Sequence, residues 1–216
     1  GFSIINVVKN NTTAHTVAHG LGAVPQMIIG KSRTGSSYRW IVYHKDIGNT
    51  HALYLNENFV KTDSVTFWND TTPTSSVFSL GTDNSWNGTS IFYCFAEKQG
   101  YSKFGSYTGN NDDNGTFVYT GFKPAFVMVK ITAGQTDNWI MQDNKINSFN
   151  GASSQRLRPN SSGAEFSSSN EIDLLSNGFK THGADGEING SGFSYIYMAF
   201  AENPFVNSNG IPVNAR

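Results

Sequence analysis

Short apolar runs separated by glycine, proline, asparagine and aspartate recur along the whole chain. Residues 27–29 (MII) and 126–129 (FVMV) are continuous apolar runs that follow a proline closely, and they predict central strands covered on both faces. Residues 195–201 (YIYMAFA) are apolar at odd and even positions alike, which predicts another internal strand. No stretch carries the apolar period of a long amphipathic helix. The pattern therefore predicts an all-β fold.

Several of these runs occur twice. The sequence IFYCFAE at residues 91–97 returns as IYMAFAE at 196–202, and GLGAVPQMIIGK at 20–31 returns as GFKPAFVMVK at 121–130. The copies begin 105 and 101 residues apart (91 to 196, 20 to 121). A period of this length is too long for a solenoid repeat and fits a whole small domain. The chain therefore reads as a tandem duplication.

Each copy has the size of a β-sandwich. We predict two tandem homologous β-sandwich domains, jelly-roll-like, over residues 1–103 and 104–216, the second ending in a short C-terminal tail. A residue present in both copies, such as Trp40 and its counterpart Trp139, is most simply a requirement of the fold. A residue present in only one copy is where a binding site should be sought.

Composition narrows the classes of partner. The 216 residues carry 15 basic and 16 acidic side chains without a basic run, which disfavours binding to a nucleic-acid backbone. No apolar run approaches the roughly 20 residues of a membrane-spanning helix, so we expect no membrane insertion. The single cysteine, Cys94, lies in an apolar run and is expected to be a buried hydrophobic residue. With 13% aromatic residues, the chain has enough material for ordered cores.

An ordered set of motifs resembles a known family. Residues 120–130 (TGFKPAFVMVK) match a G-F-x-P strand, 138–140 (NWI) a strand start, 176–179 (SNGF) a turn and strand, and 189–200 (NGSGFSYIYMAF) a closing strand. The first copy carries counterparts that end on YCFAE at residues 93–97. Taken together, these motifs resemble a β-rich repeat of tail-fibre and related structural proteins of tailed bacteriophages.

That resemblance implies a non-enzymatic structural and adhesion module of a phage virion, a tail fibre or appendage that contacts a bacterial surface glycan. It also implies self-association, with a homotrimer expected, contacts with other virion proteins, and a location in the virion after synthesis in the host cytoplasm. Two alternatives stay open. One is a glycan-degrading fibre enzyme, and the other is a pure assembly protein such as a decoration or filament subunit.

The acidic residues give no catalytic motif. Glycoside hydrolysis needs two carboxylates about 5–9.5 Å apart on either side of the scissile bond. Glu97 and Glu202 recur at the same place in the two copies, so a structural role is the better interpretation. The sequence contains neither a G-x-S-x-G nucleophile elbow nor a phosphate-binding loop. We therefore predict no catalytic residues.

Two loops are rich in oxygen ligands. Asp112 and Asp113 precede an Asn-Gly pair, and Asp185 and Glu187 flank Gly186. Carboxylate and carbonyl oxygens are the ligands that Ca²⁺ prefers, yet neither loop matches an EF-hand. Solvated hairpin turns explain the same residues. We expect no cofactor, with Ca²⁺ as the metal that these loops would favour.

Glycan binding needs an aromatic face beside amide and hydroxyl groups. Trp68 and Trp86 are absent from the second copy and stand in polar segments, so they are the predicted sugar-stacking residues. Burial under a neighbouring subunit is the alternative. The predicted ligand-binding residues are Trp68, Asn69, Asp70, Asp83, Asn84, Trp86 and Asn87.

Overall fold

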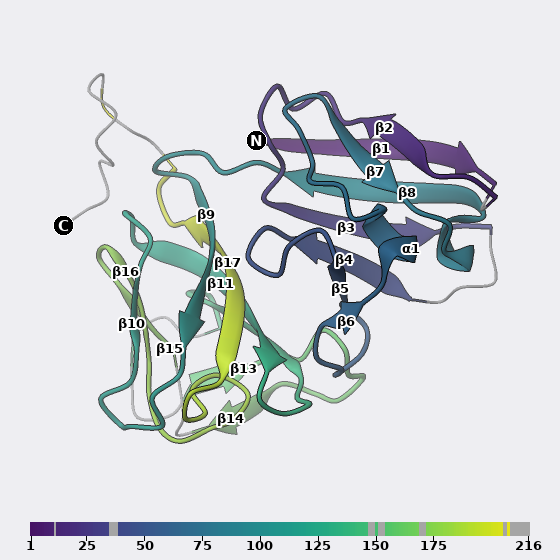
Figure 1. The fold of residues 1–216 in the computed structure, drawn as a ribbon. Helices are drawn as coiled ribbons and strands as arrows, with labels where there is room; N and C mark the ends of the chain where they lie inside the picture. The colour runs from purple at the N-terminus through teal and green to yellow at the C-terminus, as the bar shows by residue number, and fades with distance from the viewer. Residues whose placement is uncertain are drawn as a thin grey trace. The chain divides into compact units, whose positions relative to one another are not determined.

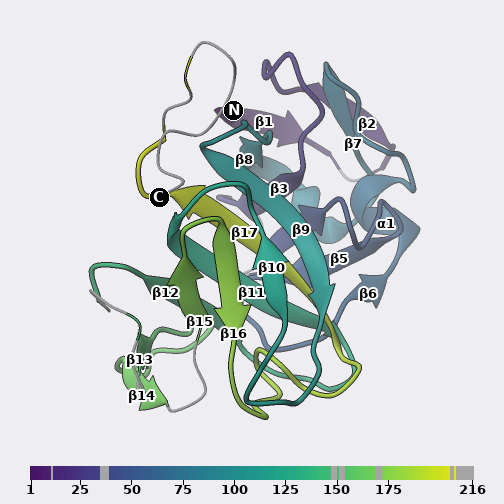
Figure 2. The same cartoon turned by 90° about the vertical axis from the view of Figure 1, so that its left-hand side faces the viewer.

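The regular secondary structure of the chain is almost entirely antiparallel β-strand (Figures 1 and 2). This computed structural model describes residues 1–10, 12–34, 39–146, 150, 154–168, 172–204 and 207. Strands make up 47% of it and helices 4%, which confirms the all-β prediction. The chain divides into two compact units, Gly1–Glu97 and Lys98–Arg216. Most of the predicted C-terminal tail lies outside the described residues.

The first unit packs two sheets around one core. Its strands are β1 (Phe2–Lys9), β2 (His15–Ala18), β3 (Met27–Ser32), β4 (Trp40–His44), β5 (His51–Tyr54), β6 (Thr62–Asp63), β7 (Val77–Leu80) and β8 (Gly88–Phe95). The larger sheet has the order β1-β8-β3-β4-β5-β6, and β2 pairs with β7 in the smaller one. Two short helices, α1 (Val65–Trp68) and η1 (Asn84–Trp86), contribute side chains to the same core. The arrangement is sandwich-like.

The second unit is sandwich-like as well. Its strands are β9 (Ser102–Thr108), β10 (Phe117–Tyr119), β11 (Pro124–Ala133), β12 (Trp139–Asp143), β13 (Ser154–Arg156), β14 (Phe166–Ser168), β15 (Ile172–Leu175), β16 (Gly178–Thr181) and β17 (Ser194–Ala201). One sheet has the order β12-β11-β17-β9, another β10-β16-β15, and β13 pairs with β14. Buried residues of the first two sheets form a single cluster.

The two units share a strand order. In the first, β1-β8-β3-β4 are neighbours; in the second, β9-β17-β11-β12 take the same sequence of places. The repeated tryptophans occupy matching positions at the starts of β4 and β12. The backbone N–H of Trp40 donates to Asn56 Oδ1 at 2.8 Å, and that of Trp139 donates to Asn160 Oδ1 at 3.0 Å. These matches support the interpretation of a tandem duplication.

The apolar runs lie where their pattern predicts. β3 lies between β8 and β4, and β11 lies between β12 and β17, so both are internal strands. Residues 195–199 of β17 are buried on both faces of the sheet. A strand apolar on both sides has to be covered on both sides, because either face left in water would cost hydrophobic free energy.

Cys94 is fully buried in β8, as predicted. Phe92 and Cys94 face the core, while Ile91, Tyr93 and Phe95 on the opposite side of the strand are half-buried. Burial raises the pKa of the Cys94 thiol to about 12. We expect Cys94→Ser to lower the free energy of unfolding by roughly 1–3 kcal/mol, because a hydroxyl replaces a thiol in an apolar site. Urea titration measures this change. Wild-type Cys94 should react with a thiol reagent only after denaturation, and rapid labelling of the native protein would contradict its burial.

Candidate functional site

Trp68 and Trp86 lie in the core of the first unit. Their side chains are 2% and 1% exposed, and their rings pack with centroids 5.5 Å apart. The indole N–H of Trp86 donates to the Phe67 carbonyl oxygen at 3.0 Å. A ring this deeply buried offers no face to a sugar, so the stacking role predicted for both residues is wrong. Both rings are buried within their own unit, so contact with a neighbouring subunit is not needed to explain these two tryptophans.

The polar residues around these tryptophans cap the two short helices. The Ser64 side chain accepts the N–H of Thr66 at the start of α1, and Asp83 accepts the N–H of Ser85 at the start of η1. Asn69 ends α1 in the left-handed region, with φ of 54°. Serine, aspartate and asparagine are the residues that favour such positions. The polar character of this segment therefore reflects helix capping.

The other predicted ligand-binding residues of this segment remain at the surface. Asp70, Asn84 and Asn87 are exposed, as is Asn69, while Asp83 is half-buried. The aromatic rings that motivated a binding site beside them point into the core instead. The segment keeps polar groups for hydrogen bonding, but it has no exposed aromatic ring on which a sugar could stack.

The predicted metal ligands do not form a metal site. Asp112 and Asp113 are exposed in the loop before β10, where Asp112 Oδ1 accepts the N–H of Asn114 at 2.8 Å. Asp185 and Glu187 are bonded to arginines instead. Within the residues that the structure describes, no three His, Cys, Asp or Glu side chains are arranged to hold a metal ion. The turn interpretation of the first loop fits its hydrogen bonding.

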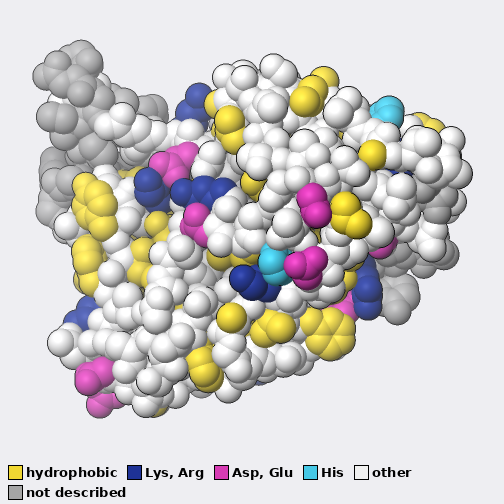
Figure 3. Space-filling model, viewed as in Figure 1, with side chains coloured by type: hydrophobic (Ala, Val, Ile, Leu, Met, Phe, Trp, Pro, Cys, Tyr) yellow, Lys and Arg dark blue, Asp and Glu magenta, His cyan; other side chains and the backbone are white. Residues whose placement is uncertain are grey.

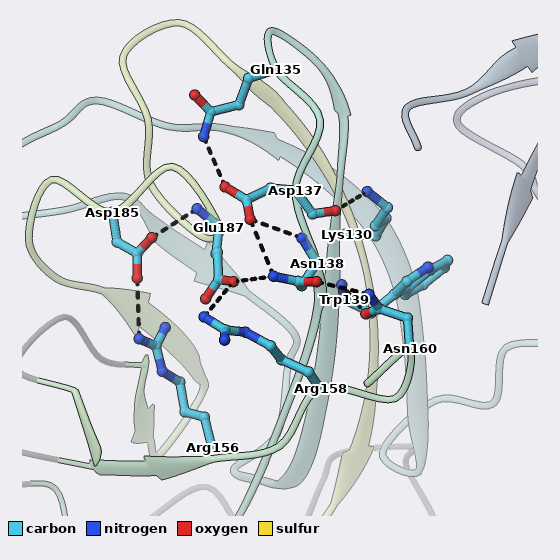
Figure 4. A network of polar contacts seen from close by, with 10 residues as sticks. All are labelled: Lys130, Gln135, Asp137, Asn138, Trp139, Arg156, Arg158, Asn160, Asp185 and Glu187. Atoms are coloured by element: carbon cyan, nitrogen blue, oxygen red, sulfur yellow. Dashed lines mark hydrogen bonds and ion pairs between the residues drawn. The ribbon is translucent and has the colours of Figure 1, made fainter. Parts of the chain in front are cut away.

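Asp185 and Glu187 belong to a polar network in the second unit (Figure 4). Asp185 Oδ2 lies 3.1 Å from Arg156 Nη2, and Glu187 Oε1 lies 2.7 Å from Arg158 Nη2. Glu187 Oε1 also accepts the side-chain N–H of Asn138 at 2.7 Å. Both carboxylates are thus neutralised by guanidinium groups, and the network ties the loop before β17 to the turn before β12.

Two cations of this network are almost fully buried. Lys130 is 0% exposed and donates to the Asp137 carbonyl oxygen at 2.6 Å. Burial lowers the pKa of Lys130 to about 8, although the charges of Asp137 and Glu187 act in the opposite direction. Arg156 is 1% exposed and packs 5.1 Å from the centre of the Phe166 ring. Lys130 thereby holds the turn at Asp137, and Arg156 holds the loop at Asp185 through Nη2.

The second unit presents two exposed aromatic rings on its smaller sheet. Phe117 and Tyr119 in β10 are 46% and 64% exposed, whereas Val118 between them is 6% exposed. Alternation along a strand turns Val118 into the core and both rings to the outer face. On the left of Figure 3, hydrophobic side chains gather in the region of β10 and β16.

Two glycines lie beside these rings. Gly178 pairs with Tyr119 across β10 and β16, and a Cβ atom added there would collide with the Val118 carbonyl oxygen and lie 3.1 Å from the Phe117 ring. Gly121 has φ of +83°, and an added Cβ atom would lie 3.5 Å from the Tyr119 hydroxyl oxygen. The bare backbone at Gly178 lets the Phe117 ring lie close to the sheet, whereas Gly121 is favoured by its positive φ.

Polar groups stand beside the rings on the same face. Lys180 pairs with Phe117 in the sheet, and its ammonium donates to Asn114 Oδ1. His182 Nε2 lies 2.8 Å from Asp173 Oδ2, and His182 Nδ1 lies 2.8 Å from the Asp113 carbonyl oxygen. An aromatic surface is therefore bordered by amide, carboxylate, ammonium and imidazole groups. We refer to the outer side of β10, β16 and β15 as the β10 face.

Asn189 fixes the loop at one end of the β10 face. It is 0% exposed, and its Nδ2 lies within 3.2 Å of Asn110 Oδ1, the Asp112 carbonyl oxygen and the Gly183 carbonyl oxygen. Its Oδ1 accepts the N–H of Asn110 at 3.1 Å. One buried amide thus joins the loop before β10 to the loop before β17, which holds Asp113 and Asn114 in place beside the rings.

Residues 1–204 match the model of a family described as a domain of unknown function, DUF7483. The chain belongs to this family. No curated protein and no solved structure matches it. This one match spans the whole of the first unit and most of the second. Among the described helices, none has the length and apolar character needed to cross a membrane.

Sequence reasoning missed the two exposed rings of this DUF7483 domain, although the duplication contains a signal for them. Shifted by 101 residues, the spacing of Gly20 and Gly121, the rings Phe117 and Tyr119 fall on Thr16 and Ala18 of β2. Thr16 and Ala18 are small, so the aromatic pair exists in one copy only. Trp68 and Trp86 were selected because they occur in one copy only. The same criterion selects Phe117 and Tyr119 once the strands of the two copies are aligned.

Proposed function

We propose that this chain is a non-enzymatic adhesion module that binds glycans through the β10 face. The observation that carries the proposal is the exposed pair Phe117 and Tyr119, lying over glycine and beside amide and charged groups. Aromatic faces stack on the C–H surfaces of sugars, and amide or carboxylate groups hydrogen-bond their hydroxyls. The binding groups of such a site lie on the β10 face and in the loop that precedes β10.

The biological setting that we propose is a phage tail fibre or related virion appendage, assembled as a homotrimer with other virion proteins and touching a bacterial surface glycan. Its support is the ordered set of motifs, found twice, that resembles tail-fibre repeats. A single aromatic ring contributes only about 1 kcal/mol to sugar binding. Several copies of the site acting together would raise the avidity to a useful level.

Asp185 and Glu187 of the second unit are each in an ion pair with an arginine, which favours a binding function over hydrolysis. A glycoside hydrolase needs one carboxyl group to protonate the leaving oxygen and a second to act as nucleophile or base. Glu187 is 5% exposed and is bonded to Arg158 and Asn138, and Asp185 is bonded to Arg156. These contacts give both groups a positioning role.

Replacing Tyr119 or Phe117 with alanine should weaken glycan binding by about fivefold each, the equivalent of about 1 kcal/mol per ring. The melting temperature should stay nearly constant because both side chains are exposed. Binding is measured on a glycan array and by adhesion to bacterial cells. Phe59→Ala is the matched control, since Phe59 is 47% exposed in the other unit. Unchanged adhesion of the double variant Phe117→Ala/Tyr119→Ala would refute the proposed site.

A second candidate function, assembly alone, is favoured by strand β1. β1 is an edge strand that pairs only with β8 among the described strands. Its outward residues Phe2, Ile4 and Val8 are 52%, 57% and 74% exposed. Apolar side chains on an exposed strand edge are the features that pair with another chain. This strand is therefore the surface through which self-association is expected.

Ile4→Lys and Val8→Lys should shift the protein from oligomer to monomer, because a charge is placed in the contact. Sedimentation velocity measures the mass in solution. Val65→Lys serves as the control, since Val65 is 52% exposed on α1, which is not part of β1 or of its neighbour β8. A wild type that is monomeric at all concentrations, or β1 variants with the oligomeric mass of the wild type, would contradict this role of β1.

A further inference from the structure

We infer that the β10 face takes an internal stretch of an uncharged polysaccharide, at least two consecutive sugar rings long, in preference to a single terminal sugar. This inference rests on the glycan-binding function proposed above and specifies its ligand class. It follows from the spacing of the two aromatic rings, from the hydrogen-bonding groups at both ends of β10, and from the balance of charges on the face.

The spacing of the rings fits two sugars. Phe117 and Tyr119 are two positions apart on one strand and on the same side of the sheet. Positions i and i+2 of a strand are separated by about 6.8 Å. A single sugar stacked centrally on one ring leaves the other ring uncovered, whereas neighbouring sugars of one chain can each meet a ring. The ligand axis therefore follows β10.

The face is bordered by polar groups at both ends of β10. Asn114 and Lys180 lie toward its start. Beyond its end, the backbone N–H groups of Thr120 and Gly121 donate to the carbonyl oxygen of Asn177, whose exposed side chain lies in the β15–β16 turn. Hydrogen-bonding groups at both ends of β10 suit a polysaccharide that lies along the strand and extends beyond the face in both directions. Sites for small ligands are typically concave and bury most of the ligand, while these rings are 46% and 64% exposed.

Charge selects against acidic sugars. The carboxylates of Asp112 and Asp113 are exposed in the loop at one end, and Asp173 faces the imidazole of His182. Lys180 supplies the ammonium group of this face. Three carboxylates outnumber the one ammonium group and the one imidazole, so the face carries a net negative charge whether or not the His182 ring is charged. A chain bearing uronic acids, sulfate or phosphate would meet repulsion, and like-charge contacts oppose binding.

The test uses an array of purified bacterial capsular and O-antigen polysaccharides of known composition, half uncharged and half acidic. A polysaccharide that binds is then partially hydrolysed, and fractions from one to six sugars compete with it for the protein. We expect uncharged polysaccharides to bind. Two-sugar and longer fragments should compete at least about fivefold better than the monosaccharides, since the second ring adds about fivefold.

Single-ring variants make the length dependence specific. In Tyr119→Ala, the gain from one sugar to two should disappear while the weak binding of one sugar remains. Phe59→Ala should retain the full wild-type gain. A gain that survives in Tyr119→Ala would place the second sugar elsewhere and overturn the two-ring geometry.

The outcomes separate the two levels of the proposal. If no polysaccharide on the array binds, the proposed glycan-binding function fails, and this inference fails with it. If a monosaccharide competes as well as longer fragments, the function stands and the inference of an internal chain is wrong. If the bound polysaccharides are mainly acidic, and binding weakens as salt is raised, the charge argument is wrong.

Discussion

Trp86→Ala should lower the free energy of unfolding by about 3–5 kcal/mol, the cost typical of removing a large buried aromatic side chain. The Trp86 ring is 1% exposed and packs against Trp68 and Phe92, with ring centroids 5.5 and 5.2 Å away. Its removal leaves a cavity in the core of the first unit, beside β3 and β8 of the larger sheet. Urea unfolding followed by circular dichroism measures the loss.

Phenylalanine substitutions separate hydrogen bonding from packing. Trp86 Nε1 donates to the Phe67 carbonyl oxygen, whereas Trp68 Nε1 is buried without a hydrogen-bond partner. Trp86→Phe loses volume and a hydrogen bond, while Trp68→Phe loses volume but relieves an unsatisfied N–H group. We expect Trp86→Phe to be the more destabilising by about 1 kcal/mol. Equal midpoints for the two variants would contradict the hydrogen-bond argument, and a wild-type midpoint for Trp86→Ala would contradict burial.

The strands were predictable because their pattern has few structural solutions. The run in β11 is apolar at every position from Phe126 to Val129. As a strand, it can bury the side chains on both of its faces only inside a sheet that is covered on both sides. The repeat also predicted how strands correspond between the two units, because similar apolar runs at similar spacings are expected to occupy equivalent positions in each fold. Trp40 and Trp139 begin equivalent strands for this reason.

The two short helices were not predictable from periodicity. α1 has 4 residues and η1 has 3, which is at most about one turn, so no apolar stripe can develop. The residues that cap them, Ser64, Asp83 and Asn69, are the types that also line ligand-binding turns. A tryptophan among them reads as a surface residue in the sequence, although the helix turns it into the core.

The polar network depends on contacts that sequence proximity does not reveal. Arg156 and Asp185 are separated by 29 positions and meet only because β13 and the loop before β17 are folded together. The β10 face has the same origin, since Phe117, Lys180 and Asp173 come from three paired strands. Register within a sheet decides which side chains share a face, and register depends on turn geometry across the whole unit.

Asn189→Ala should lower the free energy of unfolding by about 3 kcal/mol, because one buried amide serves several partners. The alanine variant leaves the Asn110 N–H and the carbonyl oxygen of Gly183 without the amide that now meets them. Asn189→Asp keeps the shape but places a carboxylate against oxygen acceptors, so it should be at least as destabilising. Asn87→Ala is the control, since the Asn87 side chain is exposed.

The same substitution should loosen the loop of residues 110–114 before it unfolds the unit. Amide hydrogen exchange in that loop should accelerate in Asn189→Ala, while exchange in β11 stays close to wild type at low temperature. Glycan binding should then weaken under conditions where circular dichroism still reports a folded protein, since Asn114 borders the β10 face. Wild-type exchange in this loop, or a wild-type unfolding midpoint, would show that Asn189 does not hold it. Wild-type glycan binding with a loosened loop would instead show that the loop contributes nothing to the ligand, leaving Phe117 and Tyr119 as its only anchors on this face.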